Sequence, residues 1–184
     1  MIYTCLSHIS NLLNEYLDSY YESMENQAEV GAIRSFSTVE IPNKIIFSFI
    51  NMERETGIGN AVTYQSAGDN RVQQTNSPWY FTLTFLMAAV YDEKRYTESV
   101  EKLSTSIAFL QQNSTIRFNN NLKFTIEPIT LNIQELSNLW GIMGGHHYPA
   151  FFGKIRLLTF DSEQISRTAS RILQPHTEAT PDKQ

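Results

Sequence analysis

NLWGIMGGHHYPAFFGKIRLLTF, residues 138–160, joins the end of one regular element to the beginning of another. Just before it, Asn132 stands at a helix N-cap position and Glu135 follows three residues later, the spacing of a capping box. Gly144 and Gly145 predict the end of this helix, because glycine takes the left-handed conformation without a steric cost. Residues 151–160 then alternate apolar with basic side chains, as a half-buried strand does. We therefore expect a short helix, a turn and a final strand.

Two longer helices are predicted upstream, from apolar residues that recur every three or four positions. The first covers residues 2–24 and holds Cys5, which is the chain's one cysteine and is expected to be a packed thiol. The second covers residues 94–112. Its predicted buried stripe consists of Tyr96, Val100, Leu103, Ile107 and Leu110.

Apolar runs predict strands at residues 44–52, 79–91 and 121–131, and the polar residues 55–77 between the first two predict a long loop. Trp79 and Trp140 each lie in an apolar pattern and are expected in the core. The fold class that follows is α+β: a mixed or antiparallel sheet of four to five strands packed by two main helices. Residues 1–160 form the expected domain, and residues 161–184 form a C-terminal arm that is partly disordered.

The composition narrows the possible partners. The chain has 184 residues and a formal net charge of −5, whereas a nucleic-acid surface needs clustered Lys and Arg, so no nucleic acid is expected. The N-terminal residues contain neither a basic leader nor a long apolar run, so we expect no signal peptide and no direct membrane insertion. The polymer partner is then expected to be protein.

The adjacent pair His146 and His147 is the strongest candidate for chemistry, because imidazole titrates near neutrality and binds metals. Adjacent side chains in a turn diverge, however, and the sequence shows no i, i+4 ligand spacing with a nearby acid. We therefore expect turn or interface residues, no catalytic residue, no metal and no cofactor. A small metal-dependent hydrolase that uses the two histidines stays open as an alternative.

Four segments together resemble a family of bacterial proteins encoded with phage-tail-like contractile injection particles, those of the antifeeding-prophage type. The resemblance covers roughly residues 1–160 and is most specific in ELSNLWGIMGG followed by YPAFFGKIRLLTF. The other segments are MIYTCLSHISNLLNEYL, IIFSFINMERE and SPWYFTLTFLMAAVYDEKRYTESVEKLSTSIAFLQQN. Members are tail terminators, or caps.

The resemblance implies a structural protein without catalysis and with a phage tail-terminator-like fold. Such a protein forms a ring, usually a hexamer, on the distal end of the inner tube and contractile sheath, and it terminates their growth. The implied partners are further copies of the chain, the inner tube protein and the sheath protein, and a second cap protein is a further candidate. Assembly is expected in the bacterial cytoplasm, as part of a contractile injection particle. Another tail component, such as a tube/baseplate adaptor, is the alternative.

Three groups of residues are candidate sites. A ring needs one surface to meet a different surface on the neighbour, so an acidic and a basic patch are candidate ring interfaces: Glu15, Asp18, Glu22 and Glu25 against Lys154 and Arg156. A sheath-binding arm that adds a strand to a sheet edge would use Ile165, Arg167, Arg171 and Ile172. The helix-to-strand turn comprises Trp140, Gly144, Gly145, His146, His147 and Pro149.

Overall fold

The structure is a computed structural model and describes residues 1–33, 41–55, 63–66, 71–75, 79–118, 122–160 and 165–170. The chain divides into two compact units. The first comprises Met1–Arg54 with Phe81–Leu158, and the second comprises Glu55–Tyr80 with Thr159–Gln184. The C-terminal segment that the sequence predicts as an arm is thus grouped with a segment from the middle of the chain.

The first unit is built on a six-stranded sheet of order β1-β2-β5-β8-β7-β6. Its strand β1 is parallel to β2, whereas β2 and β5 pair antiparallel, as do β6 with β7 and β7 with β8. The expected mixed sheet is confirmed, but with six strands instead of four to five. The strands are β1 (Ala28–Val30), β2 (Lys44–Arg54), β5 (Trp79–Val90), β6 (Thr115–Phe118), β7 (Leu122–Pro128) and β8 (Ala150–Phe160).

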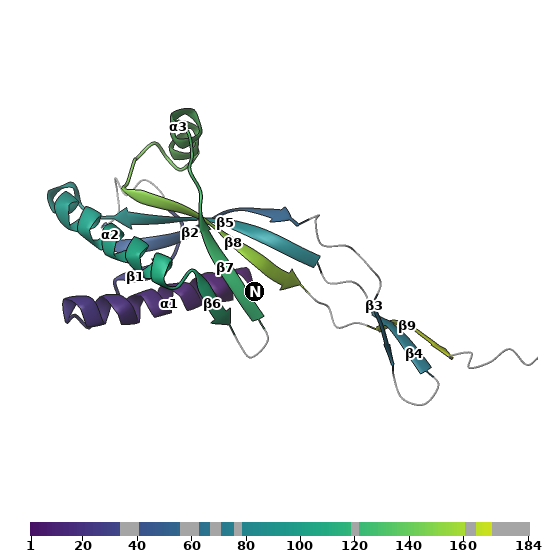
Figure 1. Cartoon of the computed structure of the whole chain (residues 1–184). Coiled ribbons are helices and arrows are strands. Elements are labelled where there is room, and N and C mark those ends of the chain that lie inside the picture. The colour runs from purple at the N-terminus through teal and green to yellow at the C-terminus, as the bar shows by residue number, and fades with distance from the viewer. Residues whose placement is uncertain are drawn as a thin grey trace, which may run out of the picture. The chain divides into compact units, whose positions relative to one another are not determined.

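Helices cover both faces of this sheet. Helix α1 (Ile2–Tyr21) and helix α2 (Tyr96–Gln112), which follows the short 3-10 helix η1 (Glu93–Arg95), lie on one face, and helix α3 (Ile133–Ile142) lies on the other (Figure 1). Successive residues of β5 point to opposite faces, and Phe85 through Val90 are all fully buried. The second half of this strand is therefore apolar on both faces, because each face is covered there. Among the described residues, no helix is long and apolar enough to cross a membrane.

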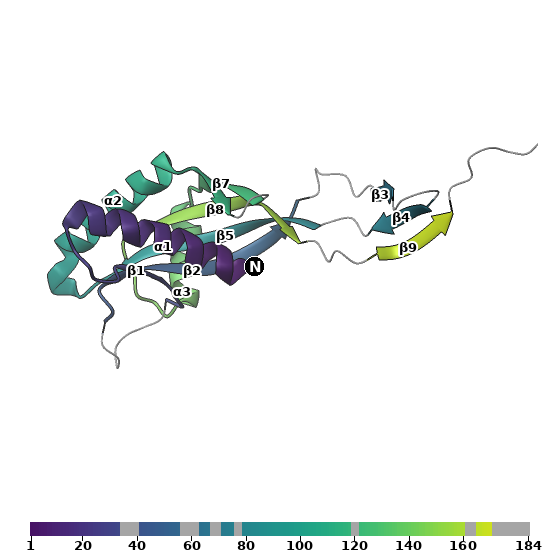
Figure 2. The same ribbon diagram turned by 90° about the horizontal axis from the view of Figure 1, so that it is seen from below.

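Helix α1 packs as its sequence pattern predicts. Its buried residues include Leu6, Ile9, Leu13 and Leu17, and Cys5 is 2% exposed, which confirms the packed thiol. Its last turn lies beside α2, where the Tyr21 hydroxyl and Thr105 Oγ1 are 2.9 Å apart; Figure 2 shows the two helices side by side.

The side chain of Asn14 fastens α1 to the edge of the sheet. Its Oδ1 accepts hydrogen bonds from the backbone N–H groups of Gln27 and Ala28, at 2.9 and 2.8 Å, and its Nδ2 donates to the carbonyl oxygen of Ala28, at 2.8 Å. These backbone groups belong to the outer margin of the sheet, where no further strand among the described residues pairs with β1. An amide side chain thus replaces the missing neighbour strand there.

Helix α2 is rotated relative to the prediction. Leu103 and Leu110 are buried as expected, but Tyr96 is 61% exposed, Val100 39% and Ile107 37%. The inward face instead carries the buried polar residues Ser99, Lys102 and Ser106. The Ser99 and Ser106 hydroxyls donate to the backbone carbonyls of Tyr96 and Lys102, so they enter the core without losing their hydrogen bonds.

The second unit holds a three-stranded antiparallel sheet of order β3-β4-β9. Its strands are β3 (Thr63–Ser66), β4 (Arg71–Thr75) and β9 (Ile165–Ser170). The prediction of a continuous loop over residues 55–77 is therefore wrong. The prediction that Trp79 is a core residue is wrong as well, because its side chain is 56% exposed.

Candidate assembly surfaces

The helix-to-strand turn is anchored by Trp140. This side chain is 5% exposed and packs into a cluster with Ile46, Leu86 and Val90 on the α3 face of the sheet. The ring centroids of His147 and Tyr148 lie 5.4 and 6.1 Å from that of Trp140, both in edge-on geometry. The turn is thus held to the sheet by one buried indole and the aromatic side chains around it.

Both ends of α3 follow the local sequence signals. The Asn132 side chain accepts from the Glu135 N–H and the Glu135 carboxylate accepts from the Asn132 N–H, each at 2.9 Å, which confirms the capping box. At the other end Gly144 and Gly145 have φ values of 106° and 81°, and the Gly145 N–H donates to the Trp140 carbonyl at 2.8 Å. The two glycines stop the helix as predicted.

His146 and His147 follow these glycines, and both are exposed. They border a pocket of about 360 Å³, hereafter the tyrosine pocket, whose apolar wall includes Tyr91, Tyr96 and Tyr148. Asp92 and Glu93 also line it, as do Lys94 and Pro149. In the part of the chain that the structure describes, no group of three or more His, Cys, Asp or Glu side chains is placed to hold a metal ion. The hydrolase alternative therefore has no metal-binding cluster within those residues.

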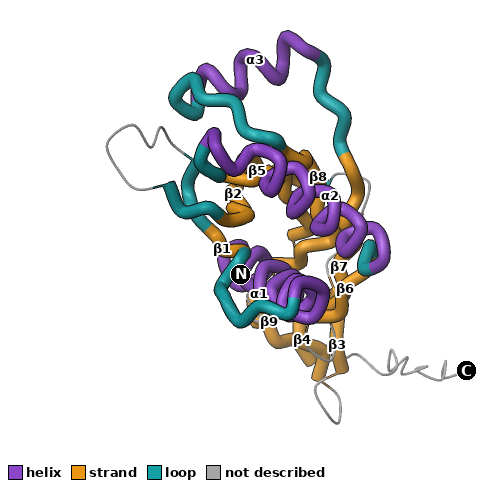
Figure 3. Tube along the Cα trace, turned by 90° about the vertical axis from the view of Figure 1, so that its left-hand side faces the viewer, coloured by secondary structure: helices purple, strands orange, loops and turns teal. Residues whose placement is uncertain are grey.

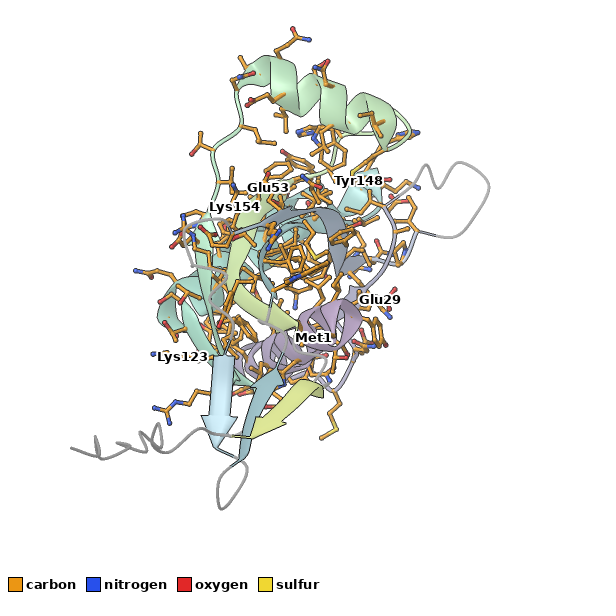
Figure 4. The ribbon with its side chains drawn as sticks, turned by 90° about the vertical axis from the view of Figure 1, so that its right-hand side faces the viewer. Met1, Glu29, Glu53, Lys123, Tyr148 and Lys154 are labelled. Carbon is orange, nitrogen blue, oxygen red and sulfur yellow. The ribbon has the colours of Figure 1, made fainter. Side chains whose placement is uncertain are left out.

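The acidic and basic patches lie on opposite faces of the sheet. Glu15 and Glu22 are exposed on or next to α1, while Glu25 follows the helix and Asp18 accepts a hydrogen bond from Gln27 Nε2 at 3.3 Å. Across the sheet the two basic residues of β8 already have partners within the chain: Arg156 Nε lies 2.9 Å from Glu127 Oε2, and Lys154 Nζ lies 3.7 Å from Glu53 Oε2. Figure 4 shows Lys154 beside Glu53.

Half-exposed ion pairs of this kind contribute little to stability, so they do not bar an exchange of partners between subunits. The pairing of the acidic with the basic patch across copies stays a prediction.

The predicted sheath-binding arm is partly a strand of the chain's own sheet. In β9, Arg167 lies opposite Gln74 of β4, and Ile165 lies opposite Thr75. Arg171 and Ile172, the other two candidates, lie outside the described residues. Within the described residues β3 and β9 each pair on one side only, so this small sheet offers two open edges.

Sequence reasoning missed a polar cluster between α1 and α2. The Lys102 ammonium lies 3.3 Å from the centroid of the Tyr21 ring and donates a hydrogen bond to Gln27 Oε1. Burial lowers the pKa of Lys102, because the charged form loses hydration. The cluster borders a pocket of about 500 Å³ that Arg95 and Glu98 also line. Lys102 lies 75 residues from Gln27 in the sequence, so no local pattern signals the cluster.

Two solved structures share this fold over 93% of the chain. One is the sheath/tube terminator of PVC, an extracellular contractile injection system, in its extended state, with a TM-score of 0.68 and 8% identity. The other is the tube terminating cap of the anti-feeding prophage, with a TM-score of 0.62 and 11% identity. The matched regions are 63% and 60% of those chains, so this chain spans less than two thirds of either. No curated protein sequence matches the chain.

The sequence also matches a family model over residues 6–174, which include the core of the first unit and the strands of the second. The chain belongs to the Pvc16 N-terminal domain family.

Proposed function

We propose that the protein is a structural cap that forms a ring on the distal end of the inner tube and contractile sheath of a phage-tail-like injection particle and terminates its growth. The observation that carries this proposal is the fold shared over 93% of the chain with two terminators of such particles. Family membership over residues 6–174 supports it. Tube and sheath proteins are the partners, and no catalytic step is required.

The ring consists of copies of this one chain, six in the proposal. A closed ring needs a heterologous contact, in which one surface of a subunit meets a different surface of the next. The opposite locations of the acidic α1 patch and the basic β8 patch are compatible with such a contact. Assembly takes place in the bacterial cytoplasm, and a second cap protein can complete the end.

The sheath contact is assigned to the three-stranded sheet. Its strand sequences, TYQS, RVQQT and ISRTAS, contain few apolar residues, so this sheet gains little from burial and much from further backbone pairing. A strand from a sheath subunit added at β3 or β9 would satisfy the open edge.

Electron microscopy of particles assembled without this chain tests the cap function. We expect tubes and sheaths of uncontrolled length or with unstable ends, and restoration of defined ends by the wild-type chain. The variant His146→Gln, which leaves the His147 ring beside Trp140 in place, should restore them equally, because no step uses imidazole chemistry. Particles that end normally without the chain but lack a baseplate would identify an adaptor instead.

Two truncations test the sheath contact. Deletion of residues 161–184 removes β9, whereas deletion of residues 171–184 keeps it and serves as the matched control. We expect only the longer deletion to yield particles with detached or overgrown sheaths. Capped particles of normal length from both deletions would exclude β9 from the mechanism.

A further inference from the structure

Two cations face each other at the outer margin of the six-stranded sheet. Arg117 of β6 lies directly opposite Lys123 of β7 in the antiparallel register, and both side chains are exposed. Like charges in directly opposite positions repel each other and destabilise a pair of strands. Within the described residues, neither cation forms an ion pair that would offset this repulsion. Arg117 and Lys123 are hereafter the basic pair.

Protection of the sheet edge accounts for only one of these two charges. Charged residues on an edge strand discourage other strands from pairing with it, and Arg117 lies on β6, which pairs with β7 alone within the described residues. Lys123 lies on β7, which pairs with β6 on one side and with β8 on the other. A second charge opposite Arg117 therefore adds repulsion without further protection of the edge.

The basic pair lies on the face of the sheet that also carries α3. In β8, Phe152 packs against the Trp140 cluster on this face, and Arg156, four residues later, points to the same side. Thr125 of β7 lies opposite Arg156, so Lys123, two residues from Thr125, has the same orientation. The cations of β6, β7 and β8 thus share one face of the sheet.

The basic pair is the part of this basic surface whose charge is not offset. Lys154 and Arg156 of β8 are already paired with Glu53 and Glu127. Figure 4 shows Lys123 well apart from Lys154 and Glu53, at the margin of the first unit. An acidic partner would therefore find unpaired charge at the basic pair, whereas at β8 it would have to displace a carboxylate of the chain itself.

The acidic α1 patch is also unfavourable on its own. Glu15, Asp18 and Glu22 lie within about 60° of one another at 100° per residue, and α1 contains neither Lys nor Arg. The C-terminal end of a helix carries a partial negative charge, so it repels these carboxylates. Glu22 at the C-cap has a φ of 49°, a left-handed conformation that glycine adopts at lower cost. Within the described residues, neither Glu15 nor Glu22 forms an ion pair.

The two surfaces do not neutralise each other within one copy. Helix α1 lies on the face of the sheet opposite to α3, and the Asn14 side chain fastens it to β1. Strand β1 forms one margin of the sheet and β6 forms the other, as Figure 3 shows. At about 4.8 Å per strand, the two margins are roughly 24 Å apart along the sheet. Each surface therefore keeps its charge for another molecule.

We propose that the acidic α1 patch of one copy docks on the basic pair of the next copy, and that this heterologous contact joins the subunits of the ring. The inference rests on the proposed cap function and names the surfaces that meet in its ring. Each surface repels its own kind, so only unlike surfaces meet, and such a contact repeats from copy to copy until the ring closes. The contact offsets both repulsions that the single subunit keeps, and local rules of stability are broken in this way at functional sites.

Charge reversal tests the contact in particles assembled with the full chain. Arg117→Glu with Lys123→Glu reverses the basic pair, and Glu15→Lys with Glu22→Lys reverses two residues of the acidic α1 patch. Either reversal alone brings like charges together and should yield the uncapped ends expected without the chain. The chain with all four substitutions should restore defined ends. All four side chains are exposed, so circular dichroism should show a folded subunit in each case.

Lys94→Glu with Glu101→Lys makes the same changes of charge at exposed positions of η1 and α2, and this matched control should cap particles normally. Loss of capping in the control, or normal capping by either reversed chain, would overturn the inference and leave the cap function intact. Loss of capping that the four substitutions together do not reverse would show that the tube or the sheath faces one of these surfaces, which also overturns it. Defined particle ends in the absence of the chain would overturn the function itself.

Zero-length cross-linking of wild-type particles gives a second measurement. A carbodiimide activates a carboxylate, and a lysine amine in contact with it then forms an amide while the reagent leaves as a urea. We expect covalent oligomers of the chain whose linked peptides join Lys123 to Glu15 or Glu22. Lys123→Arg keeps the charge but offers no such amine, so this variant should cap particles normally and lack the linked peptides. Their absence from wild-type particles would contradict the proposed contact.

Discussion

Asn14 is the residue that binds α1 to the sheet margin, through three hydrogen bonds to the backbone of Gln27 and Ala28. Asn14→Ala leaves two N–H groups and one carbonyl without these partners. We expect the free energy of unfolding to fall by about 2 kcal/mol in denaturant titrations. Asn11→Ala changes the same residue type at an exposed position of the same helix and should have little effect. Equal losses in the two variants would contradict the role of the Asn14 side chain.

Gly153 of β8 is required by the core. A Cβ at this position would lie 2.6 Å from two ring atoms of Phe85, which is fully buried and cannot move into solvent. Gly153→Ala should therefore destabilise the first unit by about 2 kcal/mol, as overpacking does. Gly31→Ala is the control, because a Cβ at Gly31 would lie at an ordinary 3.5 Å from Cγ2 of Ile46. Equal changes in melting temperature for the two variants would contradict the role of the Phe85 contact.

Tyr91 should make stability fall at alkaline pH. Burial raises the pKa of Tyr91 to about 12, and the Glu98 carboxylate acts in the same direction. A raised pKa means that the folded chain keeps a proton that the unfolded chain releases, so this contribution is complete below pH 10 and is lost between pH 10 and 12. Relative to pH 9, the wild type should lose about 2 kcal/mol more than Tyr91→Phe at pH 12.

Denaturant titrations from pH 7 to pH 12 measure this difference. Burial also raises the pKa of Cys5 to about 12, but Cys5 is present in both proteins and its contribution cancels. Parallel pH profiles of the two proteins would contradict the assignment to Tyr91.

At the scale of the element, the ends of a helix could be predicted from the sequence, whereas the face that a helix buries and the pairing of polar strands could not. The capping box and the double glycine act within a few residues, so both ends of α3 were correctly predicted. The rotation of α2 was not, because periodicity shows that apolar residues share a stripe but not which side of the helix the sheet covers. The strands β3 and β4 consist mostly of polar residues and depend on pairing with each other and with β9, which a prediction from composition cannot detect.

The candidate surfaces were likewise predictable only where neighbouring residues in the sequence form them. The turn around His146 and His147 was predicted from its own sequence, but the opposite wall of the tyrosine pocket comes from Tyr91 and Tyr96, some fifty residues upstream. The exposure of Ile133 and Ile142 could not be foreseen, since both fit a helix that packs on a sheet.

Gly141 lowers the stability of α3. Gly141→Ala should raise the free energy of unfolding of the isolated chain by about 0.5–1 kcal/mol, because the helix gains a better helix former and the added methyl group meets no atom. Calorimetry of the isolated chain measures this change. A loss of stability in the isolated chain would contradict the open environment of Gly141.

At the scale of the whole molecule, folding and sheath attachment should be separable. The Glu55 N–H donates to the Tyr80 carbonyl at 2.9 Å, so a two-residue Asn-Gly turn can join these two residues in place of residues 56–79. The first unit should then unfold within about 1 kcal/mol of the wild type, because a shorter loop lowers the entropy cost of closure and the largest buried side chains lie in this unit. Thermal unfolding followed by circular dichroism should give a melting curve like that of the wild type. Electron microscopy of particles that carry this variant should show a ring without bound sheath. Collapse of the melt would show that the second unit supports the first.

The chain passes between the two units at three places, directly after β2, within β5 and within β8, and Figure 1 shows that these adjacent strands reach the three places at the same end of the sheet. A tensile load passed between the units is therefore shared by three covalent connections. A pull along the strand axes would load their ladders in shear, so many hydrogen bonds would have to break together, which resists rupture far better than unzipping them one after another.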